Sequence, residues 1–293
     1  MRFILLLAAA LTAAPAMAQT PRAVAPGKPR SILFVGNSFT YGALSPVRRY
    51  RAEAVTDLNR TGVGGMPALF KTFTEEARLN YSVSLETQGG MMLAFHWNER
   101  RMLFDRPWDV VVLQEYSALD RERAGDVASY RQYAPMLAAM FAKRNPKVDV
   151  ELLATWTRAD LTWRSGSPWS GKPVTAMALD VRRAADGVKA LSPQIRGVIP
   201  VGEAWSRAIA AGIADPDPYD GITYGQVDLW AYDHYHASTH GYYLEALMVF
   251  GKVTGIDPTT LGAKERAADD LGIAPEVAVA LQRIAKAELA ARP

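Results

Sequence analysis

The sequence contains no cysteine. This absence excludes disulfide bonds, a thiol nucleophile, cysteine-ligated metal centres and iron–sulfur clusters. A chain of 293 residues can be stabilised by its hydrophobic core alone, so it needs no disulfide bonds even outside the cytoplasm. The absence of cysteine therefore limits the kinds of catalytic and metal-binding site that the protein can have, but it does not indicate a cellular compartment.

The chain also lacks a strong charge of either sign. Its 33 basic side chains nearly balance 30 acidic ones, and the net charge is +3. No basic stripe with interleaved aromatic residues occurs, so we expect no nucleic-acid partner and no membrane surface as partner. No glycine-rich nucleotide-binding motif stands where a strand meets a helix, so we expect no organic cofactor.

Long hydrophobic runs are missing except at the start of the chain. The segment "MRFILLLAAALTAAPAMA", residues 1–18, has one cation, a short apolar stretch and a small-x-small ending. This layout predicts a cleaved signal peptide, with an uncleaved N-terminal anchor as the alternative, and hence an exported protein, periplasmic or secreted. Residues 19–30 are rich in proline and basic residues and are expected to be a disordered lead-in to a single domain, 31–293.

Apolar strand candidates alternate with helical stretches along this domain. Strands are predicted at 31–36, 82–87, 109–114, 148–154 and 196–201, and helices at 64–79, 92–103, 127–144, 175–191, 239–254 and 275–291. Such alternation predicts an α/β protein with about five parallel strands and helices on both faces of the sheet.

The first predicted strand stops at Gly36 and is followed by Asn37 and Ser38. In open α/β sheets ligands bind at the carboxyl ends of the strands, where Ser38 is expected to lie. Gly36 permits a tight turn there. Position alone leaves two roles for Ser38, a nucleophile or the more common N-cap of the next helix.

Three of the four histidines fall in "DHYHASTHGYYLEAL", residues 233–247. Asp233 and His236 stand three residues apart before a predicted helix, a spacing that lets the carboxylate orient one imidazole nitrogen. The other nitrogen then stays free to accept a proton from a hydroxyl. Alternatively His234, His236 and His240 resemble a metal-ligand set, although a loop-to-helix break separates them.

The two ends of the chain together resemble the SGNH, or GDSL-like, hydrolase superfamily. The motifs are "FVGNSFTYG" (34–42) and Asp-x-x-His-x-Ser-x-x-Gly-x-Tyr-Leu (233–244), with "ETQGGMMLAFHW" (86–97) and "DVVVLQEYS" (109–117) as intermediate blocks. They look most like an exported bacterial branch with a Gly-Asn-Ser-Phe-Thr first block. The resemblance implies a flavodoxin-like three-layer α/β/α sandwich and ester hydrolysis, with Ser38 as nucleophile, His236 as general base and acid, and Asp233 orienting His236.

The resemblance also implies an oxyanion hole, a set of donors for the negative oxygen of the tetrahedral intermediate. Its members would be the backbone amides of Ser38 and Gly90, with Gly89 as the alternate glycine, and a side-chain amide from the third block. The usual Gly-x-Asn-Asp is absent here, and we expect Gln114 to substitute for the asparagine. Asn37 is expected to be a substrate-binding residue that also braces the turn, with a simple turn residue as the alternative.

Two further features border the expected pocket. Residues 43–63 form a long connection that is either a lid or surface decoration, and Ser45-Pro46 predicts a short helix within it. Trp156, Trp163 and Trp169 follow the fourth strand, and we expect at least one, with Trp156 as the candidate, to bind substrate. These features suggest a small-molecule or polysaccharide ester as partner, with O-acetyl groups of a carbohydrate as one class. The alternatives are a non-catalytic carbohydrate-binding protein and a metal-dependent hydrolase.

Overall fold

Six β-strands form the central sheet of the protein, which is described here by a computed structural model covering residues 27–291. In chain order the strands are β1 (Arg30–Gly36), β2 (Thr56–Asp57), β3 (Tyr81–Thr87), β4 (Val110–Gln114), β5 (Asp149–Ala154) and β6 (Ile195–Pro200). Their order in the sheet is β2-β3-β1-β4-β5-β6, and every pairing is parallel. The predicted parallel α/β fold is confirmed, and the additional strand is the two-residue β2 at the sheet edge.

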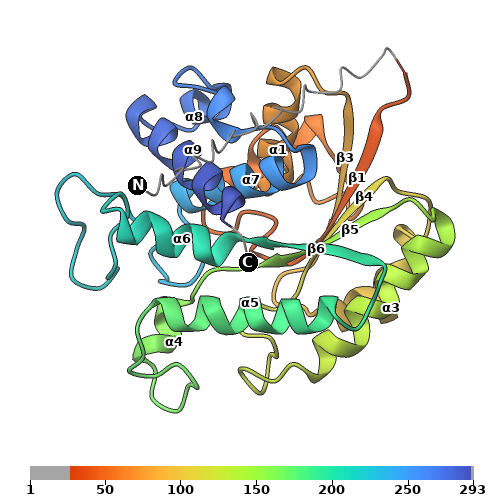
Figure 1. Cartoon of the computed structure of the whole chain (residues 1–293), viewed down its shortest axis with the longest axis horizontal. Helices are drawn as coiled ribbons and strands as arrows, with labels where there is room; N and C mark the ends of the chain where they lie inside the picture. Colours follow the sequence, from red (N-terminus) through yellow and green to blue (C-terminus); the bar gives the residue numbers. More distant parts are fainter. Residues whose placement is uncertain (1–26, 292–293) are drawn as a thin grey trace, which may run out of the picture.

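Helices cover both faces of this sheet. The alternation along β1 shows why, since Ile32 and Phe34 belong to one hydrophobic cluster while Leu33 and Val35 belong to another. On the first face lie α1 (Gly65–Glu76), α6 (Val201–Ala210), α7 (Thr239–Thr254), α8 (Arg266–Asp270) and α9 (Pro275–Ala290). On the opposite face lie α3 (Ala128–Arg144) and α5 (Thr175–Lys189), as Figure 1 shows.

Several helical regions differ from the sequence-based expectation, and the short helices α4 (Ala159–Trp163) and α8 were not predicted. The stretch predicted as one helix over 92–103 is instead α2 (Leu93–Phe95) followed by a π-helical turn and a 3-10 turn, His96–Arg100 and Arg101–Leu103. Helix α6 was not predicted, because it begins at Val201 directly after Pro200 ends β6. The apolar run therefore crosses the strand–helix boundary without a polar break.

The connection 43–63 is packed onto the domain. Its predicted short helix is confirmed as a 3-10 turn, Pro46–Arg49, capped by Ser45, whose side chain accepts a hydrogen bond from the Val47 amide. The Tyr50 hydroxyl donates to Asp270 in α8 at 2.8 Å, and Arg51 pairs with Glu75 in α1 at 2.9 Å. These contacts tie the connection to the helices of the first face.

The predicted signal peptide, residues 1–18, and most of the predicted lead-in lie outside the described residues. Arg30, the last residue of that lead-in, already belongs to β1 and forms an ion pair with Asp149 at 2.7 Å. Within residues 27–291, every helix falls short of the length and apolar character that crossing a bilayer requires.

Candidate active site

A tight turn at the carboxyl end of β1 presents Ser38. A Cβ on Gly36 would overlap the Thr40 side chain and lie 2.7 Å from Gln114 Oε1, so only glycine fits here. Gln114 Oε1, at the end of the neighbouring β4, accepts hydrogen bonds from the Asn37 amide at 2.9 Å and the Thr40 hydroxyl at 3.1 Å. The Gln114 side chain therefore occupies the space that a larger residue at position 36 would need, and its hydrogen bonds fix the turn.

Asn37 braces this turn from within. Its Nδ2 donates to the Met91 carbonyl at 3.0 Å, and its Oδ1 accepts from the Phe39 amide at 3.2 Å. The residue is only 1% exposed. The bracing role is thus the one that the contacts support. A contact between Asn37 and a substrate stays a prediction.

Helix α7 anchors the Ser38 turn. The Tyr242 hydroxyl lies 3.2 Å from the carbonyl oxygens of both Ser38 and Ala43, where it can donate to either. Ser238 is the N-cap of this helix, accepting from the Gly241 amide at 3.3 Å. The helix start, and with it the segment just before it, is therefore held against the turn that carries Ser38.

Asp233 and His236 form a hydrogen-bonded pair in that segment. Asp233 Oδ2 lies 2.6 Å from His236 Nδ1, and Oδ1 accepts from the backbone amides of Tyr235 and His236. Between them His234 adopts a left-handed backbone with φ of 58°. Burial favours a raised pKa for Asp233, but the hydrogen bonds from His236 and the amides outweigh it and lower the pKa.

The free nitrogen of His236 and the Ser38 hydroxyl lie at the same edge of the sheet. The ring of Phe39, the residue after Ser38, lies 5.5 Å from the His236 ring between centroids. Within residues 27–291, His236 Nε2 is buried and has no hydrogen-bond partner, and the Ser38 hydroxyl is not bonded to it. Catalytic hydrogen bonds of this kind often form only when substrate is bound. The structure thus places the turn that carries Ser38 beside the segment that carries Asp233 and His236, without a serine–histidine hydrogen bond.

Two backbone amides near Ser38 are unused. Among the hydrogen bonds of the described residues, none is donated by the Ser38 or Gly90 amide. Gly90 has a φ of 71° in a turn closed by a hydrogen bond from the Met91 amide to the Gln88 carbonyl, and no heavy atom lies within 4 Å of the place of a Cβ. A Cβ on Gly89 would instead lie 2.8 Å from the Tyr41 hydroxyl. Gly90 therefore faces open space, whereas Gly89 is packed.

Gln114 and Glu115 tie the loops around the site together. While Gln114 Oε1 holds the Ser38 turn, its Nε2 donates to the Glu115 carbonyl, so one of its two amide hydrogens is used. Glu115 Oε1 accepts from the amides of Leu93, at 3.1 Å, and Tyr116, at 2.7 Å. Burial raises the pKa of Glu115 to about 8.

Trp156 lies in the core, which corrects the expectation that it binds substrate. It is 0% exposed, because its ring stacks against Phe39 at 4.4 Å and Trp205 at 4.6 Å, between centroids. Its Nε1 donates to the Tyr235 carbonyl at 3.0 Å, so it supports the segment that carries His236. Trp108 and Trp205 are buried as well.

Trp163 is the exposed tryptophan of the three. It ends α4 (Ala159–Trp163) and is 51% exposed. Its ring lies 4.8 Å from the ring of Tyr219, which lies 4.0 Å from the ring of His234. An aromatic row, defined as Trp163, Tyr219 and His234, therefore leads from the surface to the residue beside Asp233.

Arg158 is a contact of the site that the sequence pattern did not indicate. Its guanidinium lies 4.1 Å from the centroid of the Tyr235 ring, which itself lies 3.8 Å from the His236 ring. Asp160 binds the guanidinium through two hydrogen bonds, at 3.0 and 2.7 Å. Burial lowers the pKa of Arg158, but the hydrogen bond and charge of Asp160 together with Tyr116 raise it by more, so the group stays charged. An arginine in an irregular loop carries no signal in a single sequence.

The remaining histidines lie in separate surroundings. His96 is fully buried and pairs with Glu86, while His240 has a pKa lowered by burial. Among residues 27–291 no group of three or more histidine, aspartate or glutamate side chains is placed to hold a metal ion. The metal alternative thus finds no ligand set in this part of the chain.

Solved structures with the same fold come from several bacteria. A DUF4886 family protein from Bacteroides uniformis aligns over 89% of this chain and 95% of its own, with a TM-score of 0.59 and 18% identity. A GDSL-like lipase from Parabacteroides merdae, described as putative, aligns over 78% of this chain and 96% of its own, with a TM-score of 0.53 and 19% identity. A lipase/acylhydrolase from Enterococcus faecalis aligns over 77% and 96%, with a TM-score of 0.50 and 16% identity.

No family model matches the sequence, and no curated protein matches it. The common ground with these structures is therefore the fold, a parallel sheet between two helical layers. The chain has the fold of the SGNH, or GDSL-like, hydrolases, as its first and last motifs predicted. No closer relationship follows from identities below 20%.

Proposed function

We propose that the protein is a serine esterase that hydrolyses carboxylic esters through Ser38, His236 and Asp233. The observation that carries the proposal is the Asp233–His236 pair, whose free Nε2 is buried at the sheet edge that also presents Ser38. The GDSL-like lipase and the lipase/acylhydrolase with the same fold agree with this class of reaction.

In the proposed reaction the Ser38 Oγ attacks the ester carbonyl carbon while His236 Nε2 takes the hydroxyl proton. Asp233 holds the imidazole in the tautomer with a proton on Nδ1 and stabilises the imidazolium. The amides of Ser38 and Gly90 donate to the negative oxygen, with Gln114 as the proposed third donor through its remaining amide hydrogen. His236 then protonates the leaving alcohol. Water, deprotonated by the same nitrogen, hydrolyses the acyl-enzyme and regenerates Ser38.

As substrate we propose O-acyl groups of a carbohydrate, with acetyl as the smallest case. The support comes from the aromatic row, because exposed tryptophan and tyrosine rings stack on the apolar faces of sugars. Trp163 and Tyr219 are 51% and 45% exposed and lead towards His234.

Hydrolysis of 4-nitrophenyl acetate, followed with and without a fluorophosphonate, tests the reaction. We expect turnover, inhibition, and a covalent adduct located on Ser38 by mass spectrometry. The adduct should be lost in His236→Ala. Folded protein that gives neither turnover nor adduct would favour the alternative, a non-catalytic carbohydrate-binding protein. Activity that survives in Ser38→Ala would contradict the serine mechanism.

We further propose that the protein is exported, on the basis of the signal-like pattern in residues 1–18. Expression of the full chain in a bacterium followed by fractionation tests this. We expect the protein in the periplasm or the medium with Gln19 at its N-terminus, as determined by mass spectrometry. Uncleaved protein in the membrane fraction would indicate an anchor instead.

A further inference from the structure

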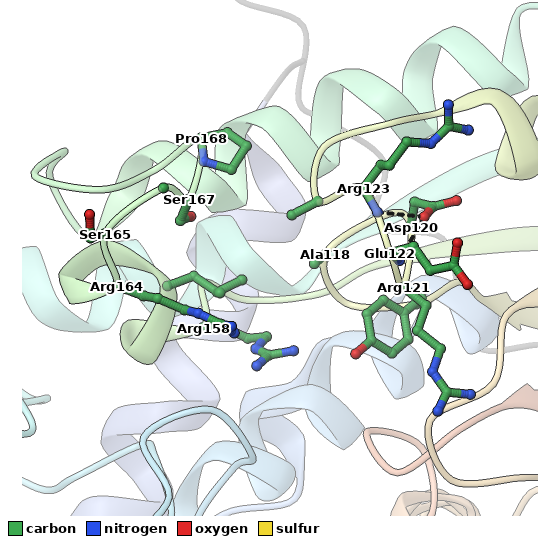
Figure 2. A pocket seen from close by; sticks show the side chains of 14 residues that line it. Ala118, Asp120, Arg121, Glu122, Arg123, Arg158, Arg164, Ser165, Ser167 and Pro168 are labelled. Carbon is green, nitrogen blue, oxygen red and sulfur yellow. Dashed lines mark hydrogen bonds between the residues drawn. The ribbon is translucent and has the colours of Figure 1, made fainter.

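A polar cleft lies beside the candidate active site. Its volume is about 500 Å³, and two segments line it: residues 116–124, which follow β4, and residues 158–168, around α4 (Figure 2). Strand β4 pairs with both β1 and β5, so the loops after these three strands leave the sheet at adjacent positions. The cleft therefore adjoins the turn that carries Ser38.

Arg158 connects the cleft to the proposed catalytic base. It lines the cleft, and its guanidinium lies 4.1 Å from the centre of the Tyr235 ring. Tyr235 in turn contacts His236, at 3.8 Å between ring centroids. The side chains of Arg158 and Tyr235 thus lie between the cleft and His236, whose Nε2 is expected to move the proton.

Basic side chains outnumber acidic ones in the lining of the cleft. Figure 2 shows Arg158 and Arg164 on one wall of the cleft and Arg121 on the other. The carboxylates of Asp120 and Glu122 stand on the same wall as Arg121 and point away from the wall that carries Arg158 and Arg164. Arg158 has Asp160 as its partner. Among residues 27–291, no carboxylate lies within ion-pair distance of Arg121 or Arg164, so both guanidinium groups are left without an ion-pair partner.

Guanidinium groups favour oxyanions, because their planar donors match the two oxygens of a carboxylate or sulfate. A cleft of this volume is in the range of sites that hold a whole organic group rather than a single ion. The aromatic row begins in the same helix, α4, that contributes one wall of the cleft. A sugar held by the row therefore has the arginines as neighbours.

We propose that the cleft binds a negatively charged group, a carboxylate or sulfate, on the saccharide part of the ester, so that the substrate is an acylated acidic saccharide. The inference rests on the proposed function, since it assigns a charge to the ester that Ser38 cleaves. Arg121 and Arg164 bind the anion, and Arg158 lies between them and the catalytic pair.

Matched polymers test the charge preference. The first pair is O-acetylated polygalacturonate before and after methyl esterification of its carboxylates, and the second is O-acetylated dextran with and without sulfate groups. We expect acetyl release to be about tenfold faster, in kcat/KM, on the charged member of at least one pair at low salt. The pair that shows the preference identifies the anion.

Variants locate the preference. Arg121→Gln combined with Arg164→Gln should reduce the ratio of rates on the charged and neutral polymers to near one. The control combines Arg144→Gln with Arg183→Gln, which removes the same charge from exposed positions of α3 and α5 outside the cleft and should keep the ratio. Calorimetric titration of the charged polymer into Ser38→Ala, with and without the cleft substitutions, reports binding without turnover.

The outcomes separate the two proposals. Hydrolysis of 4-nitrophenyl acetate with equal rates within both polymer pairs would overturn the charge inference and leave the esterase standing. A preference that the control substitutions also remove would show a general effect of net charge and would overturn the role of the cleft. Absence of any hydrolysis in the folded protein would overturn the proposed function and the inference with it.

Discussion

Asp233 accepts three hydrogen bonds, from the His236 ring and from two backbone amides, and this concentration of donors defines its chemistry. One oxygen fixes the loop while the other fixes the imidazole. Because the donors lower the pKa of Asp233, the carboxylate stays ionised where His236 must be oriented. The same residue thus serves both the local fold and the proposed proton transfer.

Asp233→Asn should therefore lower kcat for 4-nitrophenyl acetate by roughly 10²–10⁴-fold, because an amide cannot hold His236 in the required tautomer. The fold should remain, since the Asn oxygen can still accept from the backbone amides. Steady-state kinetics beside circular dichroism checks this. The exposed Asp220→Asn is a matched control expected to keep wild-type activity. A kcat for Asp233→Asn within threefold of wild type would contradict the assigned role.

Glu115 is a second acidic residue near the site, with a different consequence for pH. Its pKa of about 8 lies above the ordinary value for glutamate, so folding takes up a proton between about pH 4.5 and 8. Protonation of Glu115 makes its full contribution to the free energy of unfolding below the pKa that glutamate has in the unfolded chain. This contribution is lost as the pH rises through 8. Ionisation also places a buried charge where Glu115 joins the Leu93 and Tyr116 amides.

Glu115→Gln keeps the accepting oxygen but cannot ionise. We expect it to match the wild type in free energy of unfolding near pH 5 and to exceed it at pH 9 by a few kcal/mol, since a tenfold change in protonation is worth about 1.4 kcal/mol. Urea unfolding at the two pH values measures this difference. Parallel loss of stability in both proteins over this range would show that Glu115 does not titrate as described.

Among the elements, α7 contacts the Ser38 turn directly through Tyr242. The predicted helix 239–254 is confirmed, because its apolar sequence is visible in the chain. Its register against the Ser38 turn was not visible, because the hydrogen bonds from Tyr242 span about 200 residues of chain.

Tyr242→Phe removes this link while keeping the ring. We expect a loss of about 1 kcal/mol in stability, a typical net value for a buried hydrogen bond, and a fall in kcat of roughly fivefold or more with little change in KM. Thermal unfolding and steady-state kinetics test the two effects. Tyr243→Phe, which breaks a hydrogen bond to Gln282 away from the site, is the control and should lose stability without this change in kcat. Equal kinetics for the two variants would show that the Tyr242 link does not position Ser38.

The sequence could predict the elements that have clear local boundaries, but not the contacts between distant segments of the chain. Strands β1 and β5 are short, mostly apolar segments and β3 alternates apolar with polar residues, and the predicted bounds of all three differ from the observed ones by one residue or less. Helix α6 and the two-residue β2 lack such boundaries and were missed. At the site, Ser38, Asp233 and His236 stand in motifs, whereas the burial of Trp156 and the position of Arg158 depend on packing between distant segments.

At the scale of the whole molecule, the buried carboxyl groups set the pH range of stability. Burial raises the pKa of Glu115 to about 8, that of Glu151 to about 7, and that of Glu245, which has no hydrogen-bond partner within residues 27–291, well above its ordinary value. Each of these groups favours the folded state less as the pH rises. By contrast, ion pairs lower the pKa of Glu75 to about 2, so its contribution is lost only in acid.

We therefore expect the free energy of unfolding to be highest at about pH 5 and to fall steadily towards pH 9. Thermal melts across this range, in buffers of constant ionic strength, measure the trend. Glu245→Gln and Glu151→Gln should each flatten the alkaline side of the curve, because neither amide can ionise, while the exposed Glu122→Gln should leave it unchanged. A wild-type curve that is level or rises between pH 5 and 9 would show that these carboxyl groups are already ionised in the folded protein.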